Sequence, residues 1–133
     1  MEEIKLRLRR AEDALRAAEL SFAHRLYLDS VSRSYCSVYN SVIALFLKEN
    51  FSLPKTHAGM IAILWENRKK IAKIVSEAEI KSVQRLLQLR EESDYAVLPL
   101  IGKKEASFAL RLAKGILKRV KEHAESGKSG KGD

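Results

Sequence analysis

Residues 26–49 read LYLDSVSRSYCSVYNSVIALFLKE, and this stretch decides the fold. Its apolar residues recur every three or four positions, which is the spacing of one face of an α-helix. The first apolar stripe comprises Leu28, Val31, Tyr35, Val38, Val42 and Leu45, and a second stripe beside it comprises Tyr39, Ile43 and Phe46. The β-branched residues favour a strand, but length and period outweigh them. A helix that is apolar around most of its circumference packs against several neighbours, so we expect a central helix here.

One helix is predicted before this segment and one after it. Residues 2–24 place apolar side chains at alternating steps of four and three. These are Ile4, Leu8, Ala11, Leu15, Ala18 and Phe22. After the central helix, Asn50 is a plausible C-cap and Pro54 ends the helical pattern. Thr56 is a candidate N-cap for a short third helix that ends within residues 66–70.

The second half of the chain predicts two more helices. Ser76 and Glu79 have the spacing of a capping box and begin a fourth helix. Pro99 and Gly102 end the segment that follows, and a fifth helix runs from about residue 103 to residue 122. No residue requires a strand. The sequence therefore predicts an all-α, up-and-down bundle of four to five helices.

Length and composition predict one domain and its surroundings. The chain has 133 residues, with a bundle expected over residues 1–125 and a flexible polar tail, SGKSGKGD, over residues 126–133. Cys36 is the single cysteine, so no intrachain disulfide can form. No apolar leader or membrane span is visible, and we expect a cytoplasmic protein. The net charge of +8 favours polyanions, acidic proteins or anionic surfaces as partners.

Three blocks make the sequence recognisable. Residues 29–42 read DSVSRSYCSVYNSV, residues 53–59 read LPKTHAG and residues 86–97 read LLQLREESDYAV. In this order they resemble the HEPN domain (higher eukaryotes and prokaryotes nucleotide-binding), in its small prokaryotic members, over residues 5–120. The resemblance implies a bundle of four to five helices, usually dimeric and often paired with a minimal nucleotidyltransferase as a toxin–antitoxin system.

Active members of this family are metal-independent ribonucleases. Their arginine and histidine, spaced by four to six residues, meet the same pair of a second subunit in a cleft, where histidine moves protons and arginine stabilises phosphate charge. By resemblance Arg33 is the family arginine, whereas Asn40 occupies the histidine position. A carboxamide cannot act as general acid or base, so we expect weak or no cleavage, although Asn40 can still hydrogen-bond a phosphate or a base.

Other candidate residues accompany these two. Asp29 lies one turn before Arg33, and an ion pair between them at the bundle edge is the simpler interpretation. His57 is a candidate relocated base near a helix N-terminus, or it closes the loop onto the central helix. The resemblance adds further binding candidates, namely Tyr35, Tyr39, Lys55, Asp94 and Tyr95. For Asp94 we expect a structural role, with hydrogen bonds or an arginine partner inside the bundle.

The last helix has a one-sided basic stripe formed by Lys104, Arg111, Lys114, Lys118 and Lys121. Such a stripe can follow a phosphate backbone, although it is more often a solvated helix face. His24 and His123 are interpreted as solvated surface residues without partners. The carboxylate of Asp94 has no acidic neighbour, and neither a metal nor another cofactor is predicted.

The preferred prediction is a HEPN-type module that partners a minimal nucleotidyltransferase in a toxin–antitoxin-like pair and binds RNA or a nucleotide phosphate. One alternative is a metal-independent ribonuclease toxin that uses Arg33 with His57 as a relocated base. Another is a non-catalytic dimeric helical scaffold. We expect a homodimer, because the resemblance implies one and because helix 26–49 has more apolar surface than one small bundle needs. No membrane partner is expected.

Overall fold

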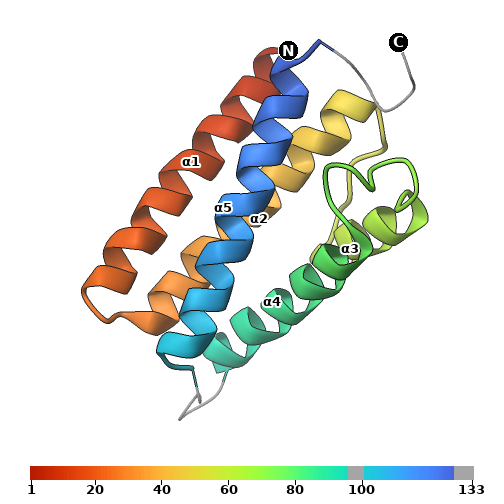
Figure 1. Ribbon diagram of the computed structural model, residues 1–133. Coiled ribbons are helices and arrows are strands. Elements are labelled where there is room, and N and C mark those ends of the chain that lie inside the picture. Colours follow the sequence, from red (N-terminus) through yellow and green to blue (C-terminus); the bar gives the residue numbers. More distant parts are fainter. Residues whose placement is uncertain (96–100, 128–133) are drawn as a thin grey trace.

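The computed structural model describes residues 1–95 and 101–127, which form five helices and no strand (Figure 1). The helices are α1 (Glu2–Ala23), α2 (Tyr27–Glu49), α3 (His57–Glu66), α4 (Glu77–Tyr95) and α5 (Lys103–Glu125). The prediction of an all-α bundle is confirmed. Most of the predicted tail, residues 128–133, lies outside the described residues.

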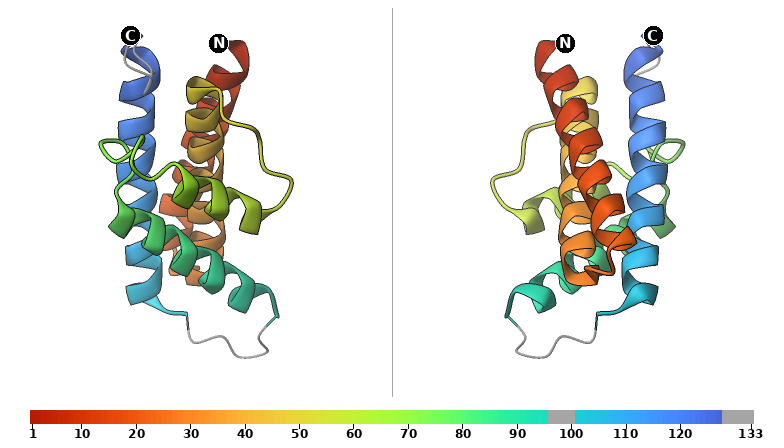
Figure 2. Two further views of the ribbon diagram at one scale, coloured as in Figure 1. Left: turned by 90° about the vertical axis from the view of Figure 1, so that its right-hand side faces the viewer. Right: turned by 90° about the vertical axis from the view of Figure 1, so that its left-hand side faces the viewer.

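The long helices α1, α2 and α5 run side by side, and α3 and α4 cover the remaining side of α2 (Figures 1 and 2). Helices α1 and α2 are antiparallel and approach closely because small residues line their contact. Ser30 Oγ donates to the Ala18 carbonyl at 2.9 Å, and Ser37 Oγ donates to the Ala11 carbonyl at 2.8 Å. These two bonds satisfy buried hydroxyls and fix the register of the two helices.

Helix α2 is the central helix, as its pattern predicts. Its side chains from both apolar stripes are buried, including Val31, Tyr35, Val38, Val42, Ile43, Leu45 and Phe46. Leu28 is an exception, with 39% of its surface exposed in the first turn of the helix. The expectation of surplus apolar surface on α2 is wrong, because α1, α4 and α5 bury that surface within one chain.

Three predicted helix boundaries are confirmed, α5 continues to Glu125 instead of ending near residue 122, and Pro99 lies outside the described residues. Asn50 ends α2 in the left-handed conformation, with φ of 61° and ψ of 33°. The Thr56 hydroxyl accepts a hydrogen bond from the Gly59 amide at 2.9 Å and so caps α3. Ser76 and Glu79 exchange backbone-to-side-chain bonds of 3.1 and 3.2 Å at the start of α4, which is the reciprocal geometry of a capping box.

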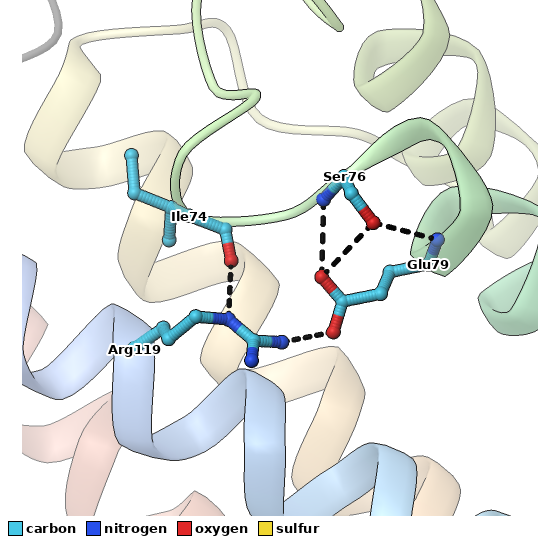
Figure 3. Close-up of polar contacts among 4 residues, drawn as sticks. All are labelled: Ile74, Ser76, Glu79 and Arg119. Carbon is cyan, nitrogen blue, oxygen red and sulfur yellow. Dashed lines mark hydrogen bonds and ion pairs between the residues drawn. The ribbon is translucent and has the colours of Figure 1, made fainter.

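One arginine of α5 joins this capping box to the rest of the bundle (Figure 3). Arg119 Nε donates to the Ile74 carbonyl at 2.8 Å, and its Nη2 pairs with the Glu79 carboxylate. The guanidinium therefore holds the segment between α3 and α4 against α5.

His123 differs from its prediction. It is not a solvated residue without a partner, because its Nε2 lies 3.0 Å from Oε2 of Glu49, whose side chain is only 1% exposed. The pair joins the last turn of α2 to the last turns of α5. His24 is exposed at the C-terminal end of α1, as predicted.

Candidate functional site

Arg33 and Asn40 lie on the same edge of α2. They are seven residues apart, which is close to two full helical turns. Both line a shallow hollow of about 290 Å³ between α1 and α2. The other residues of its lining are Arg10, Asp13, Ala14, Ala17 and Cys36. Arg33 is exposed, and no carboxylate of the described residues, Asp29 included, lies within ion-pair distance of it.

Both ends of the Asn40 carboxamide are hydrogen-bonded within the chain. Its Oδ1 accepts from Nη1 of Arg7 at 3.0 Å, and its Nδ2 donates to the Cys36 carbonyl at 2.9 Å. Asn40 is therefore engaged by α1 and by its own helix. It can orient a neighbour, but it has no proton to transfer to or from a substrate.

A second shallow hollow adjoins the first along α1. It measures about 370 Å³ and is lined by Glu3, Leu6, Arg7, Arg9, Arg10 and Asp13. Arg10 and Asp13 line both hollows, so the two are adjacent. We call Arg7, Arg10 and Arg33 the arginine cluster. Within the described chain, none of these three forms an ion pair with a carboxylate.

His57 belongs to a different cluster, on the side of α2 that faces α3 and α4. Its Nδ1 lies 2.6 Å from the hydroxyl of Tyr35, which is 1% exposed. The Tyr39 ring lies 5.2 Å from the imidazole, between ring centroids. The Arg90 guanidinium lies over the Tyr35 ring at 5.2 Å, within the range of a cation–π contact. No contact in the described structure joins His57 to Arg33 or Asn40.

The two titrating groups of this cluster have shifted pKa values. Burial raises the pKa of the Tyr35 phenol, which therefore stays protonated, and its hydroxyl shares a hydrogen bond with His57 Nδ1. Partial desolvation, with a smaller effect of the Arg90 charge, lowers the pKa of His57 below its ordinary value. At neutral pH the imidazole is therefore neutral, and its Nδ1 is hydrogen-bonded to the phenol.

The remaining candidates lie apart from both clusters. Asp29 is exposed in the first turn of α2, and Lys55 is exposed in the loop before α3. Asp94 and Tyr95 end α4 in exposed positions, and Tyr95 is 85% exposed. The expectation that Asp94 pairs inside the bundle is wrong, because the last turn of α4 extends beyond the packed core.

The basic stripe of α5 is exposed along most of its length, but part of it is paired. Lys114 Nζ lies 3.1 Å from Oε2 of Glu19, and Lys121 Nζ lies 2.9 Å from Oε2 of Glu12. Lys104, Arg111 and Lys118 have no carboxylate within ion-pair distance in the described residues. The stripe is thus divided between paired and unpaired cations.

Sequence reasoning missed Arg7, Arg10 and Arg90 as site residues. A signal existed for the first two, because Arg7 and Arg10 are one helical turn apart on the polar side of the first predicted helix. Over residues 1–95 and 101–127, no group of three histidine, cysteine or acidic side chains could hold a metal ion. No helix in those ranges is both long and apolar enough to cross a bilayer.

Comparison with known proteins agrees with the helical architecture. Residues 4–123 match the family model described as HEPN domain. A UPF0332 protein of Archaeoglobus fulgidus is 31% identical over 121 residues, which cover 91% of this chain and 94% of that protein. A Methanocaldococcus jannaschii protein named "Putative toxin MJ0605" is 36% identical over 97 residues, which cover 71% of this chain and 69% of that protein. A second protein of that organism, "Putative toxin MJ0142", is 27% identical over 121 residues, or 91% of this chain and 81% of its own length.

Proposed function

The chain belongs to the HEPN domain family, and we propose that it is a cytoplasmic, homodimeric HEPN module that binds phosphate groups of RNA or a nucleotide at Arg33. The observation that carries this proposal is the exposed guanidinium of Arg33 beside Arg10, with no carboxylate of the described residues paired to it. An unpaired guanidinium matches the geometry of a phosphate and needs no partner to be displaced before binding.

The hydrogen bonds of Asn40 support the non-catalytic part of the proposal. Proton transfer by a positioned side chain contributes about 10²- to 10⁴-fold to a rate. Asn40 cannot supply it, and its amide is already bonded to Arg7 and to the Cys36 carbonyl. A phosphodiester held at Arg33 would therefore be bound and not cleaved efficiently.

The biological setting of the proposal comes from the relatives. Two similar archaeal proteins have names that describe a toxin role. We propose that this chain works in a toxin–antitoxin-like pair, with a minimal nucleotidyltransferase as partner and with itself as a homodimer. Leu20 and Leu26, 58% and 53% exposed, offer apolar surface to a second chain. Light scattering at micromolar concentration should give about twice the chain mass of 15.1 kDa.

Purified protein incubated with mixed RNA in a metal chelator tests the main proposal. We expect RNA binding that weakens steeply with salt, and little or no cleavage. The Asn40→His variant should cleave faster, because it restores a group that can transfer protons. The matched control is Asn40→Gln, which keeps a carboxamide. Efficient cleavage by the unmodified protein that Arg33→Ala abolishes would contradict the proposal.

A second candidate function is ribonuclease activity with His57 as the base, and the Tyr35–His57 bond is the observation that favours it. If Nδ1 carries the proton and donates to the Tyr35 hydroxyl, Nε2 of the neutral imidazole keeps a free lone pair and has the form of a general base. The test compares His57→Ala with Tyr35→Phe in the cleavage assay. Loss of cleavage in His57→Ala, together with cleavage that falls at pH below the lowered pKa of His57, would favour the ribonuclease over the binding module.

A further inference from the structure

The geometry points to a second phosphate subsite on α1, formed by Arg7 and Arg10, with Asn40 as the positioning residue that orients Arg7. This inference rests on the proposed function, because it extends the phosphate site of Arg33 along a neighbouring helix. In this arrangement Asn40 orients the Arg7 side chain, and Arg7 contacts the ligand.

The bond between Arg7 and Asn40 is the first observation. Arg7 belongs to the first third of α1 and Asn40 to the middle of α2, 33 residues later. The 3.0 Å bond uses one N–H of the guanidinium, which has five. Four donors of Arg7 remain for a ligand. Holding a long, flexible side chain in one orientation lowers the entropy that it loses when it binds a phosphate.

The adjacency of the two hollows is the second observation. Arg33 and Asn40 line one side of the first hollow, Arg7 lines the second, and Arg10 lies where they join. The serine bonds of α2 to Ala18 and Ala11 set the register, so Arg33 lies level with about residue 15 of α1. Arg7 is then about 12 Å from that level along the helix axis.

The distance of about 12 Å from Arg33 to Arg7 along the helix axis distinguishes an extended nucleic-acid strand from a small anion as the ligand. In a stacked nucleic-acid strand, backbone charges recur about every 3.4 Å along the axis. A path of about 12 Å therefore spans more than one phosphate of a strand, whereas the phosphates of a mononucleotide lie together at one end. The two hollows are lined by four arginines, Arg7, Arg9, Arg10 and Arg33, against the carboxylates of Glu3 and Asp13, so their net charge is positive. Arg33 thus binds any phosphate ligand, whereas Arg7 binds only a ligand that is long enough to reach it.

Fluorescence anisotropy tests the inference with two probes. One is a labelled 12-nucleotide 2′-O-methyl oligouridylate, which has the phosphodiester backbone but no free 2′-hydroxyl. The other is AMP, measured by its displacement of the oligonucleotide. The variants are Arg7→Ala, Arg33→Ala, Asn40→Leu and the double variant Arg7→Ala/Asn40→Leu. Lys81→Ala removes one exposed cation from α4, outside both basic regions, and is the matched control.

We expect Arg7→Ala to weaken oligonucleotide binding about five- to tenfold and to change AMP binding less than about twofold. The slope of log affinity against log salt should fall by about 0.7. Arg33→Ala should weaken both probes. Asn40→Leu should weaken oligonucleotide binding about threefold in the unmodified protein and leave the Arg7→Ala variant almost unchanged, because its effect passes through Arg7.

Three results would overturn the subsite while leaving the phosphate site of Arg33 intact. Arg7→Ala could bind the oligonucleotide as Lys81→Ala does. Asn40→Leu could have the same effect with and without Arg7. Polyglutamate of matched charge could displace the oligonucleotide as well as RNA does, which would indicate a surface for acidic proteins. If Arg33→Ala bound both probes as tightly as the unmodified protein does, the proposed function itself would be contradicted.

Discussion

The arginine cluster of α1 and α2 and the basic stripe of α5 are both rich in positive charge, but their cations have different partners. On α5, Lys114 and Lys121 face carboxylates of α1 at 3.1 and 2.9 Å. In the arginine cluster, Arg7 donates a hydrogen bond to the neutral amide of Asn40. Within the described residues, no arginine of the cluster forms an ion pair. The arginine cluster and the two paired lysines of α5 therefore differ in how far the neighbouring helix neutralises their charge.

The difference has a simple energetic consequence. An exposed ion pair contributes about 0–1 kcal/mol to stability, so the pairs of α5 hold the bundle together only weakly. They nevertheless reduce the positive potential that a polyanion would meet on that face. The arginine cluster keeps its full charge and presents planar donors that fit phosphate oxygens in pairs.

Removing two cations from each region should show the largest contrast. Arg10→Ala/Arg33→Ala should weaken oligonucleotide binding about 100-fold, since each charge-assisted bond to phosphate is worth about tenfold or more. Lys114→Ala/Lys121→Ala makes the same change in net charge and should weaken binding about twofold, because those lysines are already paired. Anisotropy titrations at one fixed salt concentration measure both. Equal losses in the two double variants would mean that net charge alone governs binding.

A paired cation that is partly buried should matter for stability instead. Arg119→Ala should lower the free energy of unfolding by about 1–3 kcal/mol, because the Ile74 carbonyl and the Glu79 carboxylate both lose their donor. Arg33→Ala is the control and should stay within about 0.5 kcal/mol, since Arg33 is exposed and unpaired. Urea denaturation with an unchanged m-value measures the difference. A similar loss in Arg33→Ala would give the arginine cluster a structural role.

The fold was predictable from the sequence because its signals are local. The apolar stripes of α2, the left-handed Asn50 and the Ser76–Glu79 box each depend on residues within a few positions of one another. Leu28 was misjudged because a stripe does not reveal where neighbouring helices end. Helical spacing placed Arg33 and Asn40 on one side of an otherwise apolar helix, and the resemblance supplied their roles.

The polar partnerships were not predictable, because they join residues far apart in the chain. Arg7 and Asn40 are 33 positions apart, Glu49 and His123 are 74 apart, and Glu12 and Lys121 are 109 apart. Each depends on the register between packed helices. That register follows from the small side chains between α1 and α2 and from the packing of α5, neither of which a single helix reveals.

Releasing the paired lysines of α5 is the smallest and most specific change. In the Glu12→Gln/Glu19→Gln variant, Lys121 and Lys114 lose their carboxylates and become free to attract a polyanion. We expect oligonucleotide affinity to rise about two- to threefold, with a steeper salt dependence. The hydrogen bond and the charge of Glu12 raise the pKa of Lys121, so this pKa should fall toward its ordinary value, as NMR titration of the side chain can measure.

The matched control for this variant is Glu66→Gln/Glu92→Gln, which removes two exposed carboxylates from α3 and α4. Neither forms an ion pair within the described residues, so their removal changes the net charge without releasing a lysine. A smaller gain in the control than in Glu12→Gln/Glu19→Gln would show that pairing keeps α5 from binding. An equal gain would instead mean that total charge decides the affinity, and the distinction between the two basic regions would then fail.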